Sequence, residues 1–166
     1  MNGIGTLRQL AGRIRQELED VEYTVLRAVS GMEKAKQHHD DMYLDVVALN
    51  LHSFYSAIEK IFQKIATHVE CSLPTGANWH KKLLEQMAKE FPEVRPATIS
   101  ENTRDKLDEY RGFRHVVRNV YTYRFDLKRV EDLALASPEI LNQLRNELLA
   151  FATFLEKISS DHEKNQ

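Results

Sequence analysis

Apolar residues recur at alternating spacings of four and three along most of this chain, which places their side chains on one face of an α-helix. The first series predicts one long amphipathic helix over about residues 6–37. Its apolar positions are Leu7, Ala11, Ile14, Leu18, Val21, Val25, Ala28, Met32 and Ala35. The apolar face is narrow, as in a coiled coil, so this helix is expected to pack in a bundle. The alternative is that the part of the helix extending beyond the bundle joins a partner subunit.

A second series predicts a helix over about residues 41–71. Its stripe consists of Leu44, Val47, Leu51, Phe54, Ile58, Ile61, Ile65 and Val69. Further apolar residues beside this stripe indicate contacts on more than one side, so the helix is expected to be central to the core. Glu59 lies among these positions. It is either a buried partner for an arginine or an exposed glutamate, which is the more common case for this residue type.

The segment between these two helices, Gln-His-His-Asp-Asp at residues 37–41, contains residue types that bind metals. Adjacent residues on a helix or turn point in different directions, and no second cluster is spaced to join this one. The segment therefore predicts a solvated corner between two helices.

The middle of the chain predicts a shorter helix and then a longer one. A turn at residues 72–77 precedes a short helix at about 78–91, and prolines at positions 92 and 96 predict a loop after it. Ser100 or Asn102 can cap the next helix, which is expected to continue to about residue 123.

The last part of the chain predicts a short turn and a final helix. Asp126 can cap a turn that extends through Leu133, and Ser137 with Pro138 predicts a new helix start. The final helix is expected to end near Ile158, before a frayed polar tail at 159–166. The whole pattern predicts an all-α, up-and-down bundle of four long helices plus one or two short helices, in a single domain over residues 1–166.

Composition favours a soluble, cytoplasmic protein. The chain has 166 residues and a net charge of −2, and its one cysteine, Cys71, excludes an internal disulfide and a cysteine-based zinc site. The sequence contains neither a secretion signal nor an apolar run that could span a bilayer, so no membrane contact is expected. Because the chain is slightly acidic, any contact with nucleic acid must come from a local patch.

Such a patch lies in residues 110–126 and just beyond. From Arg111 to Arg129 there are six Lys or Arg residues and one acid, Asp126, so the local field favours a polyanion. Helical spacing places Arg114 on the apolar face of this segment. That face carries Leu107, Tyr110, Val117 and Tyr121. Since burying an unpaired guanidinium is costly, Arg114 must pair with a carboxylate, line a wet cleft or bind an anion.

Residues 113–121, Phe-Arg-His-Val-Val-Arg-Asn-Val-Tyr, resemble the signature of the HEPN superfamily, and in particular that of HepT-like proteins. That signature is Arg-x4-His-x-Tyr, with a polar residue directly after the arginine. Arg114, His115 and Tyr121 match it, whereas Asn119 stands where the family has its histidine. The likeness extends over about residues 41–158.

The resemblance implies a homodimer whose two motif helices meet at the two-fold axis. It also implies a metal-independent endoribonuclease, without a cofactor, that is the toxin of a toxin–antitoxin pair. Its partner would be a small MNT-type nucleotidyltransferase, the antitoxin, which in some systems adds AMP to the motif tyrosine. In this chain Arg114 would stabilise the charge of the phosphoryl transition state, and Tyr121 would be the modification target.

Asn119 is the departure that matters for activity. Metal-free RNA cleavage needs a proton to leave the 2′-hydroxyl and another to reach the departing oxygen, and an amide cannot transfer either. Loss of such acid–base catalysis costs about 10²–10⁴-fold in rate. His115 lies four residues before Asn119, on the same helical face, and either supplies the missing imidazole or is only the polar residue that follows the arginine.

Three functions therefore stay open. The first is a HepT-like ribonuclease toxin, with Arg114, His115 and Asn119 at its catalytic site. The second is a catalytically silent HEPN protein that binds RNA or an MNT partner through Arg111, Arg118 and Arg124. The third is a helical-bundle protein-interaction module in which such arginines only form surface ion pairs, Arg111 and Arg124 with Glu109 or Asp126.

Overall fold

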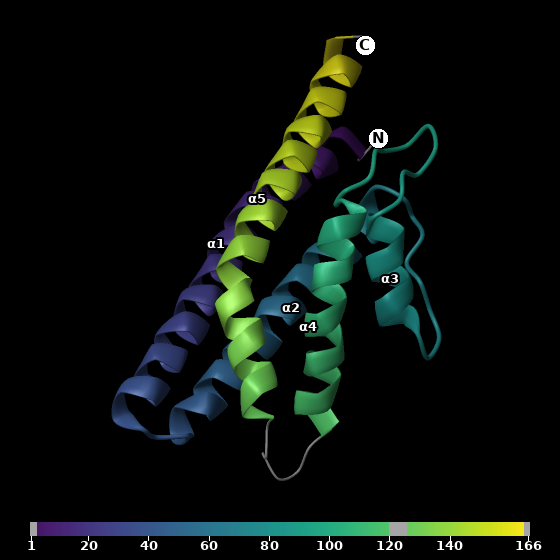
Figure 1. Ribbon diagram of the computed structural model, residues 1–166. Helices are drawn as coiled ribbons and strands as arrows, with labels where there is room; N and C mark the ends of the chain where they lie inside the picture. The colour runs from purple at the N-terminus through teal and green to yellow at the C-terminus, as the bar shows by residue number, and fades with distance from the viewer. Residues whose placement is uncertain (1–2, 120–125, 165–166) are drawn as a thin grey trace.

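The computed structural model describes residues 3–119 and 126–164, which form five helices joined at the two ends of a bundle (Figure 1). They are α1 (Gly3–His38), α2 (Met42–His68), α3 (Trp79–Met87), α4 (Glu101–Asn119) and α5 (Leu127–Lys164). The four long helices run alternately up and down, and the short α3 packs against α2 and α4. This arrangement confirms the predicted all-α bundle. No helix in these ranges is both long and apolar enough to cross a membrane.

The apolar stripe of α1 packs against α2 and α5. All of its predicted positions are buried except Leu7, which is half-buried. Gly31 lies at the contact with α2, where an added Cβ would stand 2.9 Å from the side chain of Val47. Glycine disfavours an isolated helix, but at this position it allows α1 and α2 to approach each other closely.

The turn between α1 and α2 is the corner that the polar segment predicts. His39 takes a left-handed backbone conformation, with φ of +49°, and the Asp40 carboxylate accepts a hydrogen bond of 2.9 Å from the Met42 amide. The His38 ring stacks on Tyr43 across the corner. Histidine and aspartate thus shape the turn through local contacts.

The predicted helix restart at Ser137 is wrong, because α5 continues without a break from Leu127 and holds Pro138 in its interior. Proline lacks the N–H that would bond the carbonyl four residues earlier, and its ring crowds that carbonyl. The hydroxyl of Ser137 donates to that carbonyl, on Ala134, at 2.7 Å. The hydroxyl of Tyr110 donates to the next carbonyl back, on Leu133, also at 2.7 Å. The Ser137 hydroxyl therefore replaces the hydrogen bond that Pro138 cannot make, and Tyr110 ties the same turn of α5 to α4.

Both ends of α5 are held by polar contacts. At its start, the Asp126 carboxylate caps the helix by accepting from the Lys128 amide at 3.0 Å, as predicted. At its other end the predicted frayed tail is wrong, because the helix continues to Lys164 and Ser159 is fully buried. The Arg8 side chain of α1 pairs with Glu163 at 3.1 Å and so ties this last part to the bundle.

Helices α2 and α3 end three and four residues earlier than the pattern predicts, at His68 and Met87. The carbonyl of Met87 accepts hydrogen bonds from the amides of Thr98 and Ile99, at 2.9 and 3.2 Å. The returning chain thus occupies the acceptor that another turn of α3 would have used.

The loop between α3 and α4 is fastened by a fully buried ion pair between Arg95 and Glu70. The guanidinium of Arg95 also donates to the carbonyls of Lys89, Pro96 and Gln86, at 2.8, 2.8 and 3.0 Å. A buried charge needs such complete pairing to be tolerated. One arginine therefore holds the irregular segment against the end of α2.

Replacing Arg95 with methionine should strongly destabilise the protein, because the Glu70 carboxylate would remain buried without a cation, with only the Gln86 amide as a donor. We expect a loss of about 3–5 kcal/mol in the free energy of unfolding, measured by chemical denaturation. The control is Arg8→Met, which removes the pair with Glu163 in which both side chains are about half exposed. That change should cost less than about 1 kcal/mol. Equal losses in the two variants would contradict the role assigned to Arg95.

Candidate nucleic-acid interface

The motif arginine, Arg114, lies on α4 and points toward α2. Its Nε donates a hydrogen bond of 3.0 Å to the Ser56 hydroxyl, and its Nη2 lies 3.7 Å from a carboxylate oxygen of Glu59. The Arg114 side chain is 18% exposed, while that of Glu59 is 5% exposed. Of the two interpretations of Glu59, the buried partner of an arginine is the one that the structure confirms.

A third helix contributes to the same carboxylate. His80, near the start of α3, places its Nδ1 2.6 Å from the second oxygen of Glu59. The imidazole stacks on the neighbouring Trp79 ring, with 3.7 Å between ring centroids, and is 25% exposed. Glu59 therefore joins a histidine of α3 to an arginine of α4, and we call Ser56, Glu59, His80 and Arg114 the arginine cluster.

A second histidine lies beside this cluster. His52 is on α2 one turn before Ser56, and both border a hollow of about 470 Å³ between α1 and α2. Burial lowers the pKa of His52 below its ordinary value of 6.5, and the guanidinium groups of Arg114 and Arg118 lower it further. The imidazole is thus held in its neutral form near the motif helix.

The other predicted residues of α4 occupy different environments. His115 and Arg118 are exposed, whereas Arg111 is half-buried and pairs with Asp108 at 2.6 Å. That pair corrects the expectation of Glu109 as partner, because residues three apart face each other on a helix and residues two apart do not. The side chain of Asn119, and the whole of Tyr121 and Arg124, lie outside the described residues.

Sequence reasoning missed His80 and His52, although both carried a signal. His80 stands at helical spacing from Leu83, Leu84 and Met87, which are all buried, so its imidazole shares their inward face. His52 is likewise four residues before Ser56, the hydrogen-bond partner of Arg114. The groups that act on each histidine lie on another helix: Glu59 of α2 for His80, and Arg114 and Arg118 of α4 for His52.

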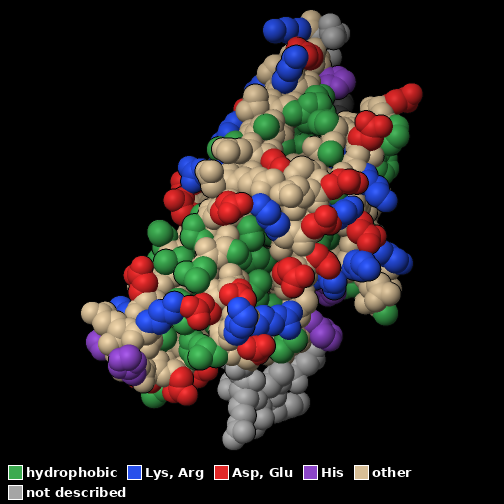
Figure 2. All heavy atoms as spheres, in the orientation of Figure 1, with side chains coloured by type: hydrophobic (Ala, Val, Ile, Leu, Met, Phe, Trp, Pro, Cys, Tyr) green, Lys and Arg blue, Asp and Glu red, His purple; other side chains and the backbone are tan. Residues whose placement is uncertain are grey.

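The charges on the visible face of the molecule are mixed. Figure 2 shows acidic and basic side chains interspersed over α3, α4 and α5 rather than a continuous basic surface. An RNA contact on this protein would therefore depend on a few placed cations, in agreement with the net charge of −2.

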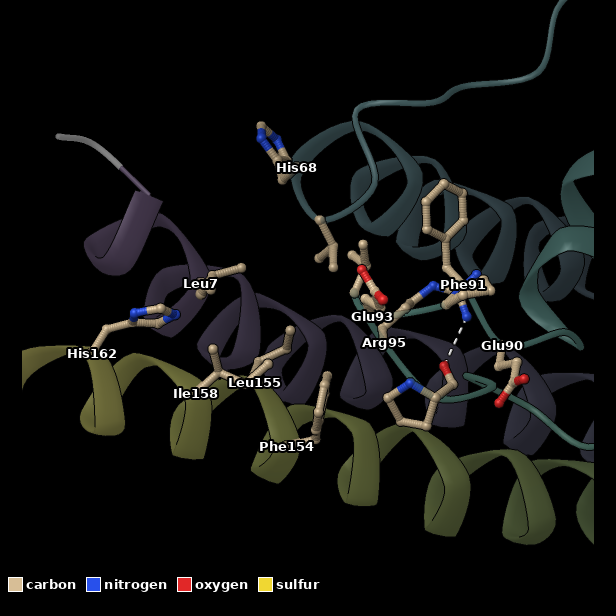
Figure 3. A pocket seen from close by; sticks show the side chains of 14 residues that line it. Leu7, His68, Glu90, Phe91, Glu93, Arg95, Phe154, Leu155, Ile158 and His162 are labelled. Carbon is tan, nitrogen blue, oxygen red and sulfur yellow. Dashed lines mark hydrogen bonds between the residues drawn. The ribbon is translucent and has the colours of Figure 1, made fainter.

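A larger hollow, of about 930 Å³, lies at the opposite end of the bundle, where α1 begins and α5 ends (Figure 3). Its floor is apolar and includes Leu7, Leu155 and Ile158. Arg95, the cation that borders it, is already bonded to Glu70 and three carbonyls. The arginine of this hollow is therefore not available to bind an anion. Within residues 3–119 and 126–164, no group of three His, Cys, Asp or Glu side chains is arranged to hold a metal ion.

The fold and the arginine cluster define a helical-bundle protein with a charged polar site between α2, α3 and α4. A family model described as HepT-like protein matches residues 46–155, which extend from α2 into α5 and include the motif helix. Because this match covers more than half of the chain, the protein belongs to the HepT-like family of the HEPN superfamily. Comparison with curated proteins and with solved structures found no match.

Replacing His52 with asparagine should make stability less dependent on pH. Below about pH 6.5 the unfolded chain takes up a proton at this histidine, while the folded chain resists protonation because its pKa is lowered. The free energy of unfolding of the wild type should therefore fall as the pH falls below 6.5, and the variant should lose this part of the decline. Chemical denaturation between pH 8 and pH 5 measures both slopes.

The control for this experiment is His68→Asn, which changes an exposed histidine of the same helix. Its slope should match that of the wild type. If His52→Asn also keeps the wild-type slope, then His52 is not held neutral in the folded protein.

Proposed function

We propose that this protein is a HepT-like toxin that cleaves RNA without a metal, and that Arg114 stabilises the negative charge of the transition state. The observation that carries the proposal is the position of Arg114 on the motif helix. Its guanidinium is mostly buried yet still reachable, and it lies 3.7 Å from Glu59, a separation longer than a hydrogen bond. A loosely paired cation in a partly desolvated place is suited to bind a phosphate.

The contribution of Arg114 to this chemistry is positioning and charge. In metal-free cleavage the 2′-oxygen attacks the adjacent phosphorus, and the phosphorane carries extra negative charge on its oxygens. A guanidinium that faces those oxygens stabilises the transition state more than the ground state. The hydrogen bond to Ser56 holds the guanidinium in place, so little reorganisation is needed when RNA binds.

Binding of RNA would involve further residues of the motif segment and a second copy of the chain. Arg111, Arg118 and Arg124 supply positive charge along this segment in the proposal. In the proposed homodimer, the two motif helices would lie against each other, as the resemblance to HEPN proteins implies. Val116, which is exposed on α4 within the motif, would give such a contact some apolar area.

The antitoxin in this proposal is an MNT-type nucleotidyltransferase. It would silence the toxin by transferring AMP to the hydroxyl of Tyr121, which stands at the modified position of the family signature. An added phosphate next to the motif would bring negative charge to the place where RNA phosphates bind.

The second candidate function is a HEPN protein that binds RNA, or the MNT partner, without cleaving. Asn119 favours it, because an amide replaces the family's proton-transferring histidine. On this alternative Arg114 and Arg118 hold a phosphate, and no bond is broken.

Substituting Arg114 should separate these alternatives. We expect Arg114→Ala to lower the rate of RNA cleavage in the presence of a metal chelator by about 10²–10³-fold. Arg114→Lys should recover only part of this loss, because an ammonium cannot contact two phosphate oxygens as a planar guanidinium does. Single-turnover cleavage of a structured RNA measures all three proteins.

The control is Arg145→Ala, which removes an exposed arginine that pairs with Glu22 at 2.7 Å on the α1–α5 side of the bundle. It should cleave like the wild type. Wild-type binding of RNA that needs Arg114, with no cleavage at any pH, would favour the silent alternative. Absence of cleavage, together with absence of binding to RNA and to the MNT-type nucleotidyltransferase, would refute both.

Incubation with an MNT-type nucleotidyltransferase and ATP should add AMP to the wild-type protein and abolish cleavage. Tyr121→Phe should prevent the modification, as seen by the mass of the intact protein. Tyr23→Phe, which alters an exposed tyrosine of α1, is the matched control and should be modified normally. Modification that persists in Tyr121→Phe would show that another residue is the target.

A further inference from the structure

We propose that His80, held by Glu59, is the group that transfers the proton in RNA cleavage, in place of the histidine that Asn119 has replaced. This inference rests on the proposed ribonuclease function and assigns its missing acid–base residue. The motif helix lacks that group at position 119, whereas α3 brings an imidazole to the same carboxylate that pairs with the motif arginine.

The geometry places the histidine and the arginine on the two oxygens of one carboxylate. His80 Nδ1 lies 2.6 Å from Oε2 of Glu59, and Arg114 Nη2 lies 3.7 Å from Oε1. These three side chains come from α3, α2 and α4, which lie side by side in the bundle (Figure 1). Glu59 thus holds Arg114, the cation for the phosphate, close to His80, the base for the adjacent 2′-hydroxyl of the RNA.

The carboxylate also sets which nitrogen of His80 is available. An ionised carboxylate has no proton to donate, so Nδ1 of His80 carries the hydrogen of this bond. Nε2 is then the nitrogen with a free lone pair, as in other sites where a carboxylate orients a catalytic histidine. Since 25% of the His80 side chain is exposed, a substrate can reach the ring.

The proposed step balances without a metal or a further reactant. Nε2 of His80 takes the proton of the 2′-hydroxyl while the 2′-oxygen forms a bond to phosphorus and the bond from phosphorus to the 5′-oxygen breaks. The leaving 5′-oxygen takes a proton from water, and the imidazolium later returns its own proton to solvent. The products are a 2′,3′-cyclic phosphate and a 5′-hydroxyl.

His80 suits this step better than His52 does. A base must become charged when it accepts a proton, and Glu59 stabilises the imidazolium of His80. His52 instead faces the positive charges of Arg114 and Arg118, which together with burial lower its pKa and oppose protonation. Glu59 therefore acts as a positioning residue, and His80 as the catalytic one.

Other charged or titratable groups lie near Glu59. Tyr55 of α2 interacts with Glu59, and also with Asp108, Arg111 and Arg114 of α4. Asp108 and Arg111 pair with each other, so their charges largely offset. Glu59 is the group in direct contact with the imidazole.

The test compares single-turnover cleavage by the wild type, His80→Asn and Glu59→Gln across pH 5–9 with a metal chelator present. Loss of the base should lower the rate by about 10²–10⁴-fold in His80→Asn. Glu59→Gln should lower the maximal rate of cleavage, because the imidazole loses the carboxylate that orients it. Binding of an RNA with 2′-deoxy substitution at the cleavage site should remain close to that of the wild type in His80→Asn.

The matched control is His162→Asn, an exposed histidine of α5. Its rate and pH profile should equal those of the wild type. His115→Asn, run in parallel, tests the imidazole of the motif helix itself. If His115→Asn abolishes cleavage and His80→Asn does not, the base is on α4 and the inference is refuted.

A purely structural role for His80 would give a different result. His80 also anchors α3 to α2, so an unfolded variant would lose activity for that reason alone. Histidine resonances of the folded wild type, labelled with carbon-13 at the ring, avoid this problem. Addition of the 2′-deoxy-substituted RNA should shift the His80 resonance. An unchanged His80 resonance in the bound protein would overturn the inference.

The failure of this inference can be distinguished from that of the proposed function. If the wild type cleaves and His80→Asn cleaves equally well with the same pH profile, only the assignment of His80 is wrong. If the wild type does not cleave RNA at any pH, the ribonuclease proposal fails and the role of His80 fails with it.

Discussion

The site depends on one buried carboxylate, Glu59, which has to be neutralised where three helices meet. An ionised carboxylate in a protein interior is tolerated only when cations or hydrogen-bond donors surround it. Arg114 of α4 and His80 of α3 meet this requirement from two sides. The need to compensate one charge on α2 therefore fixes how the motif helix and the short helix face each other.

A second buried ion pair serves a purely structural purpose at the other end of the bundle. Arg95 and Glu70 are both fully buried, and the remaining donors of the guanidinium bond to backbone carbonyls. Arg114 differs from Arg95 because it remains partly exposed and lies farther from its carboxylate. The contrast separates an arginine whose bonding is complete from one that can still take an anion.

The continuity of α5 connects the site to the rest of the fold. Pro138 would normally end or kink a helix, but the Ser137 hydroxyl bonds to the Ala134 carbonyl that it leaves without a donor, and Tyr110 bonds to the carbonyl of Leu133 beside it. Tyr110 belongs to α4, one turn before Arg114, so the contact that supports α5 also sets the position of the motif helix.

The sequence by itself determined the helices, the stripes that form the core, the cap at Asp126 and the family signature around Arg114. Each of these depends on residues close together in the chain, where spacing and residue type are informative. Only the tertiary structure decided that Glu59 is buried, that His80 joins it, and that Pro138 is accommodated within a helix. Those outcomes rest on contacts between residues 21 to 58 positions apart, whose partners local spacing cannot identify.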